Sequence, residues 1–189
     1  MENAITHPER SRINIPRNTL VVLCGPAGCG KSTFAAKQFL PTQTVSSDNC
    51  RALVSDDPTN QVISGHAFDL MYFIIEKRLL LGRFTTADAT NLQRDDRKIL
   101  IKIARSFDFN AAAVVFDIPL EVCLDRNAAR ARRIPEDALR KQYELLESTL
   151  QTIDRERFDY VYILDQQDQD RVEIKVGPPK AVSRPRRRY

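Results

Sequence analysis

Short apolar runs alternate along the chain with longer segments whose apolar residues recur every three or four positions. The short runs cover residues 19–24 (TLVVLC), 42–46, 84–87, 111–116 (AAAVVF) and 160–164 (YVYIL). Apolar runs of this length that are rich in β-branched residues are typical of strands buried on both faces of a sheet. The pattern therefore predicts five strands.

The segments between these runs have helical periodicity. Helices are expected at residues 31–39, 62–81, 95–107, 119–130 and 135–153, and Pro119 opens one of them in the first-turn position that proline favours. Strands that alternate with helices at this spacing call for a parallel sheet. We predict an α/β fold with a five-stranded parallel sheet flanked by helices.

Composition and charge divide the chain into three parts. Residues 1–17 are polar and look like a lead-in, residues 18–168 hold the periodic pattern of one domain, and residues 169–189 form a basic tail that we expect to be flexible. The net charge is +4, but six positive charges and no acid lie from Lys175 onward, so residues 1–174 carry −2. The tail either adds phosphate affinity to a nucleic-acid binder or is a solvated terminus.

Membrane spans, zinc sites and disulfides find no support in the composition. No apolar run approaches the roughly 18 residues of a membrane span, and the first residues lack the hydrophobic block of a signal peptide, so we expect a cytoplasmic protein. The cysteines Cys24, Cys29, Cys50 and Cys123 show neither C-x-x-C nor histidine partner spacing. They are expected to be small buried residues rather than zinc ligands or disulfides.

The strongest chemical signal is GPAGCGKS, directly after the first strand and before the first helix. It fits G-x-x-x-x-G-K-[ST], the P-loop pattern, in which backbone N–H groups surround phosphates. Lys31 is expected to reach the β- and γ-phosphates of ATP or another nucleoside triphosphate, and Ser32 to ligate Mg²⁺. The predicted nucleotide-binding residues here are Gly25, Pro26, Ala27, Gly28, Cys29, Gly30, Lys31, Ser32 and Thr33.

Two classes of P-loop protein can be compared with the rest of the chain. GTPase switches carry D-x-x-G and N-K-x-D stretches, and neither pattern occurs here. A small kinase is the better class. It needs a residue that receives the acceptor's proton, a cover over the phosphates, and cationic groups for the transferring phosphoryl group.

Two polar segments at predicted strand ends could supply the acceptor side. SSDNCR follows the second strand: Asp48 is a candidate general base, and Arg51 a candidate for holding an anion on the acceptor. The alternative for Asp48 is a cap of a following helix. Asp88, Thr90 and Asn91 end the third strand, where Asp88 supports the metal's water shell or caps the next helix.

Arginines in RNAARARR are the candidate cover. Arg126, Arg130 and Arg133 are spaced i, i+4, i+7, so in a helix they share one face, as a helical lid over the triphosphate would require. We expect all three to bind nucleotide, and Arg126 and Arg130, with Lys31 and Asp48, to be catalytic. An arginine stripe that is only a solvated face is the alternative.

These motifs together resemble a known family. Residues 20–164 resemble the kinase module of bacterial polynucleotide kinase-phosphatase, an RNA repair enzyme, through GPAGCGKSTFAAKQF, VSSDNCRALVSDD, DATNLQ, AVVFDIP, the R-x-x-x-R-x-x-R of the expected lid and FDYVYIL. Two features depart from the family. The chain has no D-x-D-G-T phosphatase signature, and Asp117 stands where an amide is expected.

The resemblance implies ATP- and Mg²⁺-dependent phosphorylation of the 5′-hydroxyl end of RNA or DNA. By position it makes Asp48 the general base, Arg51 the clamp on the acceptor's phosphate, and the three arginines the lid. Phosphatase or ligase activity would then come from a separate partner. Two alternatives stay open: a P-loop kinase of a small metabolite, antibiotic or nucleotide sugar, and an ATP-dependent nucleic-acid binding module without transfer.

Overall fold

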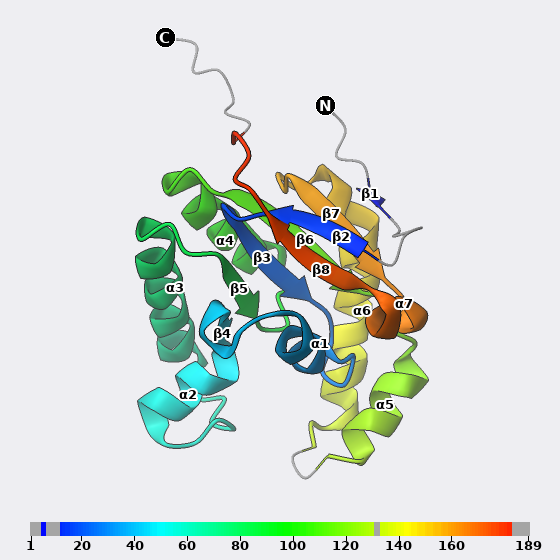
Figure 1. Cartoon of the computed structure of the whole chain (residues 1–189). Coiled ribbons are helices and arrows are strands. Elements are labelled where there is room, and N and C mark those ends of the chain that lie inside the picture. Colours follow the sequence, from blue (N-terminus) through cyan, green and yellow to red (C-terminus); the bar gives the residue numbers. More distant parts are fainter. Residues whose placement is uncertain (1–4, 7–11, 131–132, 183–189) are drawn as a thin grey trace.

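The computed structural model describes residues 5–6, 12–130 and 133–182. Its main sheet contains the five predicted strands, all parallel, in the order β7-β6-β3-β5-β4 (Figure 1). Their bounds are β3 (Thr19–Cys24), β4 (Thr44–Ser46), β5 (Thr85–Asp88), β6 (Asn110–Phe116) and β7 (Tyr160–Leu164). The predicted sheet is thus confirmed. A two-residue strand that no pattern signals, β1 (Ile5–Thr6), extends it beside β7.

The expected helices are present, with shifted ends. They are α1 (Lys31–Gln38), α3 (Ser64–Leu80), α4 (Arg94–Ser106), α5 (Leu120–Ala128) and α6 (Glu136–Thr152). Pro119 and Pro135 stand at the N-caps, one position before the helix. The pattern does not predict α2 (Ser47–Ser55), α7 (Gln166–Arg171), or the short 3-10 turns η1 (Pro41–Gln43) and η2 (Ile153–Arg155).

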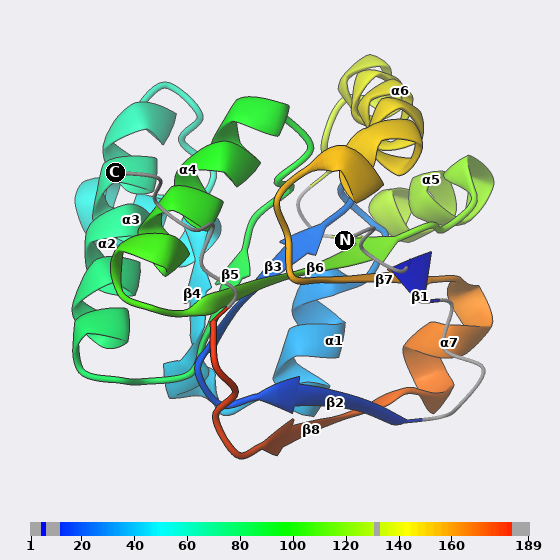
Figure 2. The same cartoon turned by 90° about the horizontal axis from the view of Figure 1, so that it is seen from above.

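Both faces of the sheet are covered, as a parallel sheet requires. On one face Leu20, Val22 and Cys24 belong to a buried cluster with residues of α3, α4 and α6. On the other face Val21 and Leu23 belong to a second buried cluster, which includes residues of α1. Figure 2 shows from above that α1 and α7 lie on this side of the sheet, opposite α3, α4 and α6. Successive side chains of β3 thus enter opposite clusters, and because both clusters are buried, the sequence of β3 is almost continuously apolar.

A second, two-stranded sheet shifts the expected boundaries of the domain. β2 (Arg12–Pro16) and β8 (Glu173–Gly177) pair in parallel, with Ile13 opposite Ile174. Their buried isoleucines join the cluster over α1, so the folded unit extends beyond the expected limits of 18 and 168. Each strand alternates apolar and polar residues, but its partner lies some 160 residues away, which local pattern cannot reveal. Residues 183–189 of the expected tail lie outside the described residues.

The carboxyl ends of the main sheet's strands and the end of β8 lie on opposite sides of the molecule. The carboxyl ends of β3, β4 and β5 meet at one end together with the start of α1, whereas the end of β8 lies at the opposite end (Figure 1). In open α/β sheets ligands bind at the carboxyl ends of the strands, so a ligand site is expected at that end.

Within the described residues, no helix has the length and apolar character needed to cross a bilayer. All four cysteines are buried free thiols.

Candidate active site

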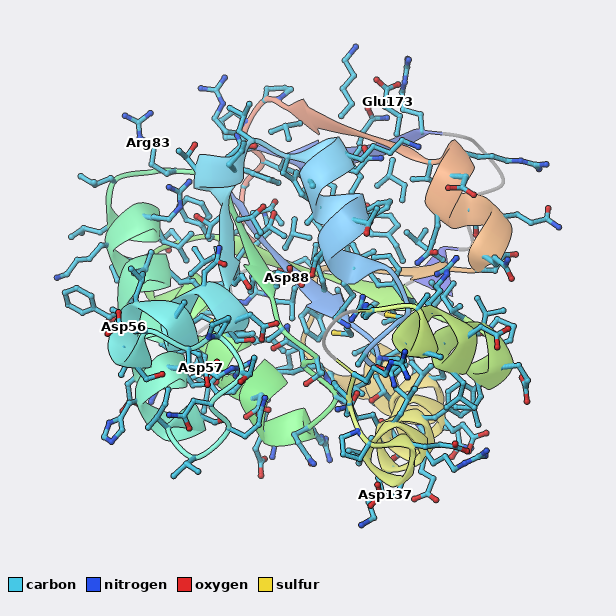
Figure 3. All side chains as sticks on the ribbon, turned by 90° about the horizontal axis from the view of Figure 1, so that it is seen from below. Asp56, Asp57, Arg83, Asp88, Asp137 and Glu173 are labelled. Carbon is cyan, nitrogen blue, oxygen red and sulfur yellow. The ribbon has the colours of Figure 1, made fainter. Side chains whose placement is uncertain are left out.

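A cleft of about 540 Å³ lies at the carboxyl ends of β3, β4 and β5. The phosphate-binding loop (residues 25–32), the start of α2, the end of β5 and the start of α3 line it, with contributions from the segment after α5 and from α6. Among the predicted site residues it brings together Ala27, Gly28, Gly30, Lys31, Ser32, Asp48, Arg51, Asp88 and Arg130. Asp88 lies near the centre of this end of the molecule (Figure 3).

The phosphate-binding loop depends on glycine at two positions. Gly28 and Gly30 have φ angles of 81° and 98°, in the region that side chains disfavour, and a Cβ on Gly28 would clash with the Cys123 carbonyl. Lys31 is buried, and its Nζ donates to the carbonyl oxygens of Gly25 and Pro26 at 2.8 Å each. Lys31 thus holds the loop closed on itself, and a bound phosphate would compete for its donors.

Ser32 and Asp88 form a pair of hard oxygen donors beside Lys31. The Asp88 carboxyl is buried and accepts a hydrogen bond from Ser32. Burial raises its pKa, an effect that Ser32 and Lys31 oppose and that Asp48 reinforces. The cap alternative for Asp88 is wrong, because α4 begins only at Arg94 and its N-cap is Gln93. A hydroxyl, a carboxylate and phosphate oxygens are the ligands that Mg²⁺ takes in such sites, so these residues fit that ion.

Asp48 and Arg51 lie in the first turns of α2, a helix that the sequence pattern leaves open. Ser46 is the N-cap, and its side chain accepts from the Asp48 N–H at 3.2 Å, so the capping role considered for Asp48 belongs to Ser46. The Asp48 side chain is about half exposed, at 54%, and lines the cleft. It is therefore available to a ligand.

Asp48 and Arg51 form an ion pair in the structure, whereas the sequence analysis gives them separate roles. The buried Arg51 guanidinium donates from Nη2 to Asp48 Oδ1 and from Nε to the Pro58 carbonyl at 3.1 Å. Because Pro58 fixes the guanidinium and the guanidinium bonds the carboxylate, the orientation of Asp48 depends on Arg51.

The arrangement predicted for the lid arginines is wrong. α5 ends at Ala128, so Arg126 is helical and Arg130 follows the helix. Arg133 comes after residues 131–132, which are not among the described residues. The helix stops because the Asn127 amide bonds both backbone groups of Ile134, at 3.0 and 2.8 Å, and Pro135 disfavours a helical Ile134. A continuous helical face through all three arginines is therefore excluded.

The three arginines take different positions around the cleft. Arg126 Nη1 lies 3.4 Å from the Cys29 carbonyl and 3.3 Å from Gln169 Oε1, beside the phosphate-binding loop. Arg130 lines the cleft itself. Arg133 is exposed and is not among the described residues that line the cleft.

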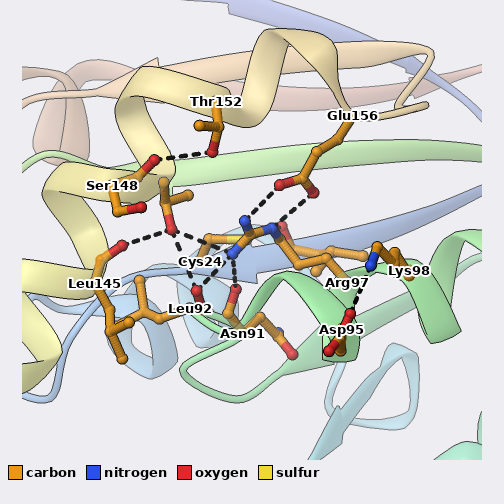
Figure 4. A network of polar contacts seen from close by, with 12 residues as sticks. Cys24, Asn91, Leu92, Asp95, Arg97, Lys98, Leu145, Ser148, Thr152 and Glu156 are labelled. Atoms are coloured by element: carbon orange, nitrogen blue, oxygen red, sulfur yellow. Dashed lines mark hydrogen bonds and ion pairs between the residues drawn. The ribbon is translucent and has the colours of Figure 1, made fainter.

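A buried network around Arg97 fixes the segment that follows Asp88 (Figure 4). Arg97 is 1% exposed; its Nε donates to Glu156 Oε2 at 2.9 Å, and its Nη1 donates to the carbonyls of Asn91 and Leu92 at 2.9 and 2.8 Å. The Asn91 side chain, expected in the cleft, instead donates to the Leu23 carbonyl at 2.8 Å. The Gly25 N–H donates to the Thr90 carbonyl at 2.9 Å, so the network supports the first residue of the phosphate-binding loop.

The strand, loop and helix that carry these residues match a protein family along most of the sequence. The family described as AAA domain matches residues 20–153, more than half of the chain. The chain belongs to this family. Its P-loop kinase-type fold is shared with solved structures of several kinases, and the cleft described above lies at this family domain's phosphate-binding loop.

Curated relatives of this AAA domain have different names and are longer. Transcription factor bHLH140 of Arabidopsis thaliana is 30% identical over 66% of this chain and 13% of its own length. L-seryl-tRNA(Sec) kinase of Methanococcus maripaludis is 26% identical over 66% of this chain and 51% of its own. The chain thus spans about half or less of the length of these relatives.

Solved structures show the shared fold. A chain of the Pnkp1/Rnl/Hen1 RNA repair complex superposes with a TM-score of 0.62 and 23% identity, over 74% of this chain and 47% of that chain. A sugar kinase from Janibacter sp. HTCC2649 superposes with a TM-score of 0.55 and 21% identity, over 82% of this chain and 92% of that chain. At these identities the likeness shows that the fold is shared and nothing beyond the fold.

Sequence reasoning missed several residues that the structure places at the cleft or against the phosphate-binding loop. Gln142 of α6 accepts from the Ala27 N–H at 2.8 Å, and Gln169 of α7 donates to the Cys29 carbonyl. Gln61, Ser64 and Phe68 line the cleft. A glutamine on an amphipathic helix looks like any solvent-facing residue, and only the packing of α6 and α7 against the loop distinguishes these two.

Proposed function

We propose that this AAA domain is a polynucleotide 5′-hydroxyl kinase, which transfers the γ-phosphate of ATP to the 5′-hydroxyl end of RNA or DNA. The observation that carries the proposal is the shared cleft: the phosphate-binding residues Lys31 and Ser32 and the Asp48–Arg51 pair line one cavity. A donor site and an acceptor base in one cavity are what in-line phosphoryl transfer requires.

In the proposed reaction the 5′-hydroxyl oxygen forms a bond to the γ-phosphorus while the bond from the γ-phosphorus to the bridging oxygen breaks and ADP leaves. Asp48 receives the hydroxyl proton. Lys31 and Arg130, which both line the cleft, stabilise the charge of the transferring group, and Arg126 contacts the donor from its place beside Cys29. Ser32 and Asp88 would hold Mg²⁺, which neutralises charge on the β- and γ-phosphates when it is bound.

Arg51 supports a polynucleotide rather than a neutral acceptor. Its guanidinium has five N–H donors, of which Asp48 and Pro58 accept two, and it is fixed next to the proposed base. A phosphate adjoining the acceptor hydroxyl would find a rigid, partly desolvated partner there. The RNA repair complex that shares the fold includes proteins named Rnl and Hen1, which is consistent with separate partners for end repair.

A second candidate is a kinase of a small hydroxyl compound. Its support is the sugar kinase whose chain this AAA domain covers over 92% of its length. The two candidates differ in whether the acceptor carries a phosphate of its own.

Acceptor preference tests the proposal. We expect the protein to phosphorylate a nucleoside 3′-monophosphate at least about tenfold more efficiently, in kcat/KM, than the same nucleoside, because a charge-assisted hydrogen bond contributes about 1.5–3 kcal/mol. In Arg51→Gln this ratio should fall close to one. The ratio of the two kcat/KM values reports on the contact between Arg51 and the acceptor's phosphate, since any misorientation of Asp48 affects both acceptors alike.

Arg140→Gln is the matched control, because Arg140 is exposed on α6, pairs with Glu136 and does not line the cleft. A parent protein without preference for the phosphorylated nucleoside, or one that phosphorylates a sugar acid more efficiently than either, would favour the small-molecule candidate.

A further inference from the structure

A second cavity lies away from the proposed active site and is rich in arginine. It has a volume of about 470 Å³ and is lined by Arg17 after β2, by residues at and before η1, by Arg78 near the end of α3, by Gly82 to Phe84 before β5, and by Val176 of β8. Its lining includes Arg17, Arg78 and Arg83 and no acidic residue. We call it the basic groove.

The arginines of the basic groove lack acidic partners within the described part of the chain. No ion pair there involves Arg17, Arg78 or Arg83, whereas arginines elsewhere, such as Arg12 and Arg140, pair with glutamates. Burial lowers the pKa of Arg78, and the neighbouring Arg83 lowers it further. Like charges held together without an acid make a site that an anion would stabilise.

Arg78 is fixed in place. Its Nε donates to Thr85 Oγ1 at 3.1 Å and its Nη2 to the Phe84 carbonyl at 3.0 Å, while Nη1 is in no hydrogen bond to the described residues. Arg83 and Arg17 are exposed, and Arg83 projects outward at the edge of the molecule (Figure 3). One anchored and two exposed guanidinium groups are suited to phosphate oxygens that lie along a surface.

The position of the basic groove limits what its ligand can be. Phe84 precedes β5 and Asp88 ends it, so the groove and the proposed active site lie at opposite ends of this strand. Four residues of strand measure about 13 Å, the length of about four stacked nucleotides at 3.4 Å each. A ligand that occupies the active site and also reaches the groove must therefore be a chain.

The segment that follows β8 is also positively charged. Asn18 bonds both backbone groups of Lys180, at 2.8 and 2.9 Å, so the chain leaves the described residues beside Arg17. The sequence that follows contains Arg184, Arg186, Arg187 and Arg188 and no acid. Within the described residues, Lys180 thus adds a further basic residue next to Arg17.

We propose that the basic groove binds the phosphate backbone of a nucleic-acid strand several nucleotides away from the 5′ end held in the active site. The choice of nucleic acid as the ligand rests on the proposed function, whereas the binding of phosphate rests on the charge and shape of the groove itself. Its binding is sequence-independent and sensitive to salt, as phosphate contacts are.

The test compares strand lengths in a double variant, Arg17→Gln with Arg83→Gln, which spares the anchored Arg78. For a single-stranded 5′-phosphorylated oligonucleotide of about 15 nucleotides, binding followed by fluorescence anisotropy should weaken about three- to tenfold, since each exposed charge pair contributes only modestly to affinity. The slope of log affinity against log salt should become less steep by about 0.7 for each phosphate that the variant no longer neutralises. Binding of a dinucleotide should change less than about twofold, because it cannot reach the groove.

The control is Lys102→Gln with Arg171→Gln, which removes the same charge from exposed positions outside the groove. Equal weakening in the control, equal weakening for the dinucleotide, or tighter binding of a glutamate-rich peptide than of the oligonucleotide at the groove would each overturn the proposal. Binding is measured without catalysis. A protein that binds long strands through the groove but transfers no phosphate therefore contradicts the proposed kinase and supports the groove.

Discussion

Asp48→Asn is expected to lower kcat for phosphorylation of a 5′-hydroxyl oligonucleotide by about 10²- to 10⁴-fold, the contribution typical of general acid–base catalysis. The amide has nearly the shape of the carboxylate but cannot receive the acceptor's proton. ATP affinity should hardly change, because Asp48 lies in α2 and not in the phosphate-binding loop. Steady-state kinetics and equilibrium ATP binding measure the two effects separately.

Asp56→Asn provides the matched control for this change. Asp56 is exposed at the C-cap of the same helix, with a φ of 55° that asparagine also tolerates, and it does not line the cleft. This variant should keep the activity of the parent. Equal kcat of Asp48→Asn and the parent would contradict the role of Asp48 as general base. A parent that binds nucleotide and nucleic acid without transfer, and an Asp48→Asn variant that binds both equally well, would favour the binding module.

Arg97→Met is expected to destabilise the fold by about 3–5 kcal/mol, because it removes the buried guanidinium that donates two hydrogen bonds to the buried Glu156 carboxylate. It also removes the donor to the Asn91 and Leu92 carbonyls, next to the Thr90 carbonyl that accepts from Gly25. Urea denaturation followed by circular dichroism measures the decrease in the free energy of unfolding. Adding Glu156→Gln should recover part of this free energy, since the buried negative charge that Arg97 pairs with is then removed.

Arg94→Met at the exposed start of the same helix is the control and should lie within about 0.5 kcal/mol of the parent. If Arg97→Met does not fold, Arg97→Lys and Glu156→Gln still report on the pair, because each nearly keeps the side-chain volume while removing hydrogen bonds. A destabilisation below about 1 kcal/mol for all of these variants would show that the network contributes only as much as an exposed pair.

The sheet and the phosphate-binding loop could be predicted because their signals are local. Residues 19–24 and 111–116 are continuously apolar, as strands buried on both faces of a sheet are, and GPAGCGKS has its meaning between a strand and a helix. Asp48, Arg51 and Asp88 could be placed at one edge because parallel strands end together. The cleft that they share follows from that topology.

The remaining features depend on contacts between distant parts of the chain. β2 is recognisable only beside β8, and the Gln142 contact with Ala27 spans 115 residues. The predicted helical face of the lid arginines is wrong for a local reason. It extends the i, i+4, i+7 spacing past Asn127, whose side chain ends the helix by bonding Ile134. Nothing in the structure explains the acid at Asp117, whose N–H donates to the Leu164 carbonyl at 2.9 Å.

The central claim is that the cleft holds both the triphosphate and a polynucleotide 5′ end. Its most direct test is incubation of the protein with γ-labelled ATP, Mg²⁺ and a 5′-hydroxyl oligonucleotide, followed by digestion of the product to nucleotides. We predict that the label appears in the 5′-phosphate of the terminal nucleotide. A protein that binds ATP but leaves no label on any RNA or DNA end would contradict the claim.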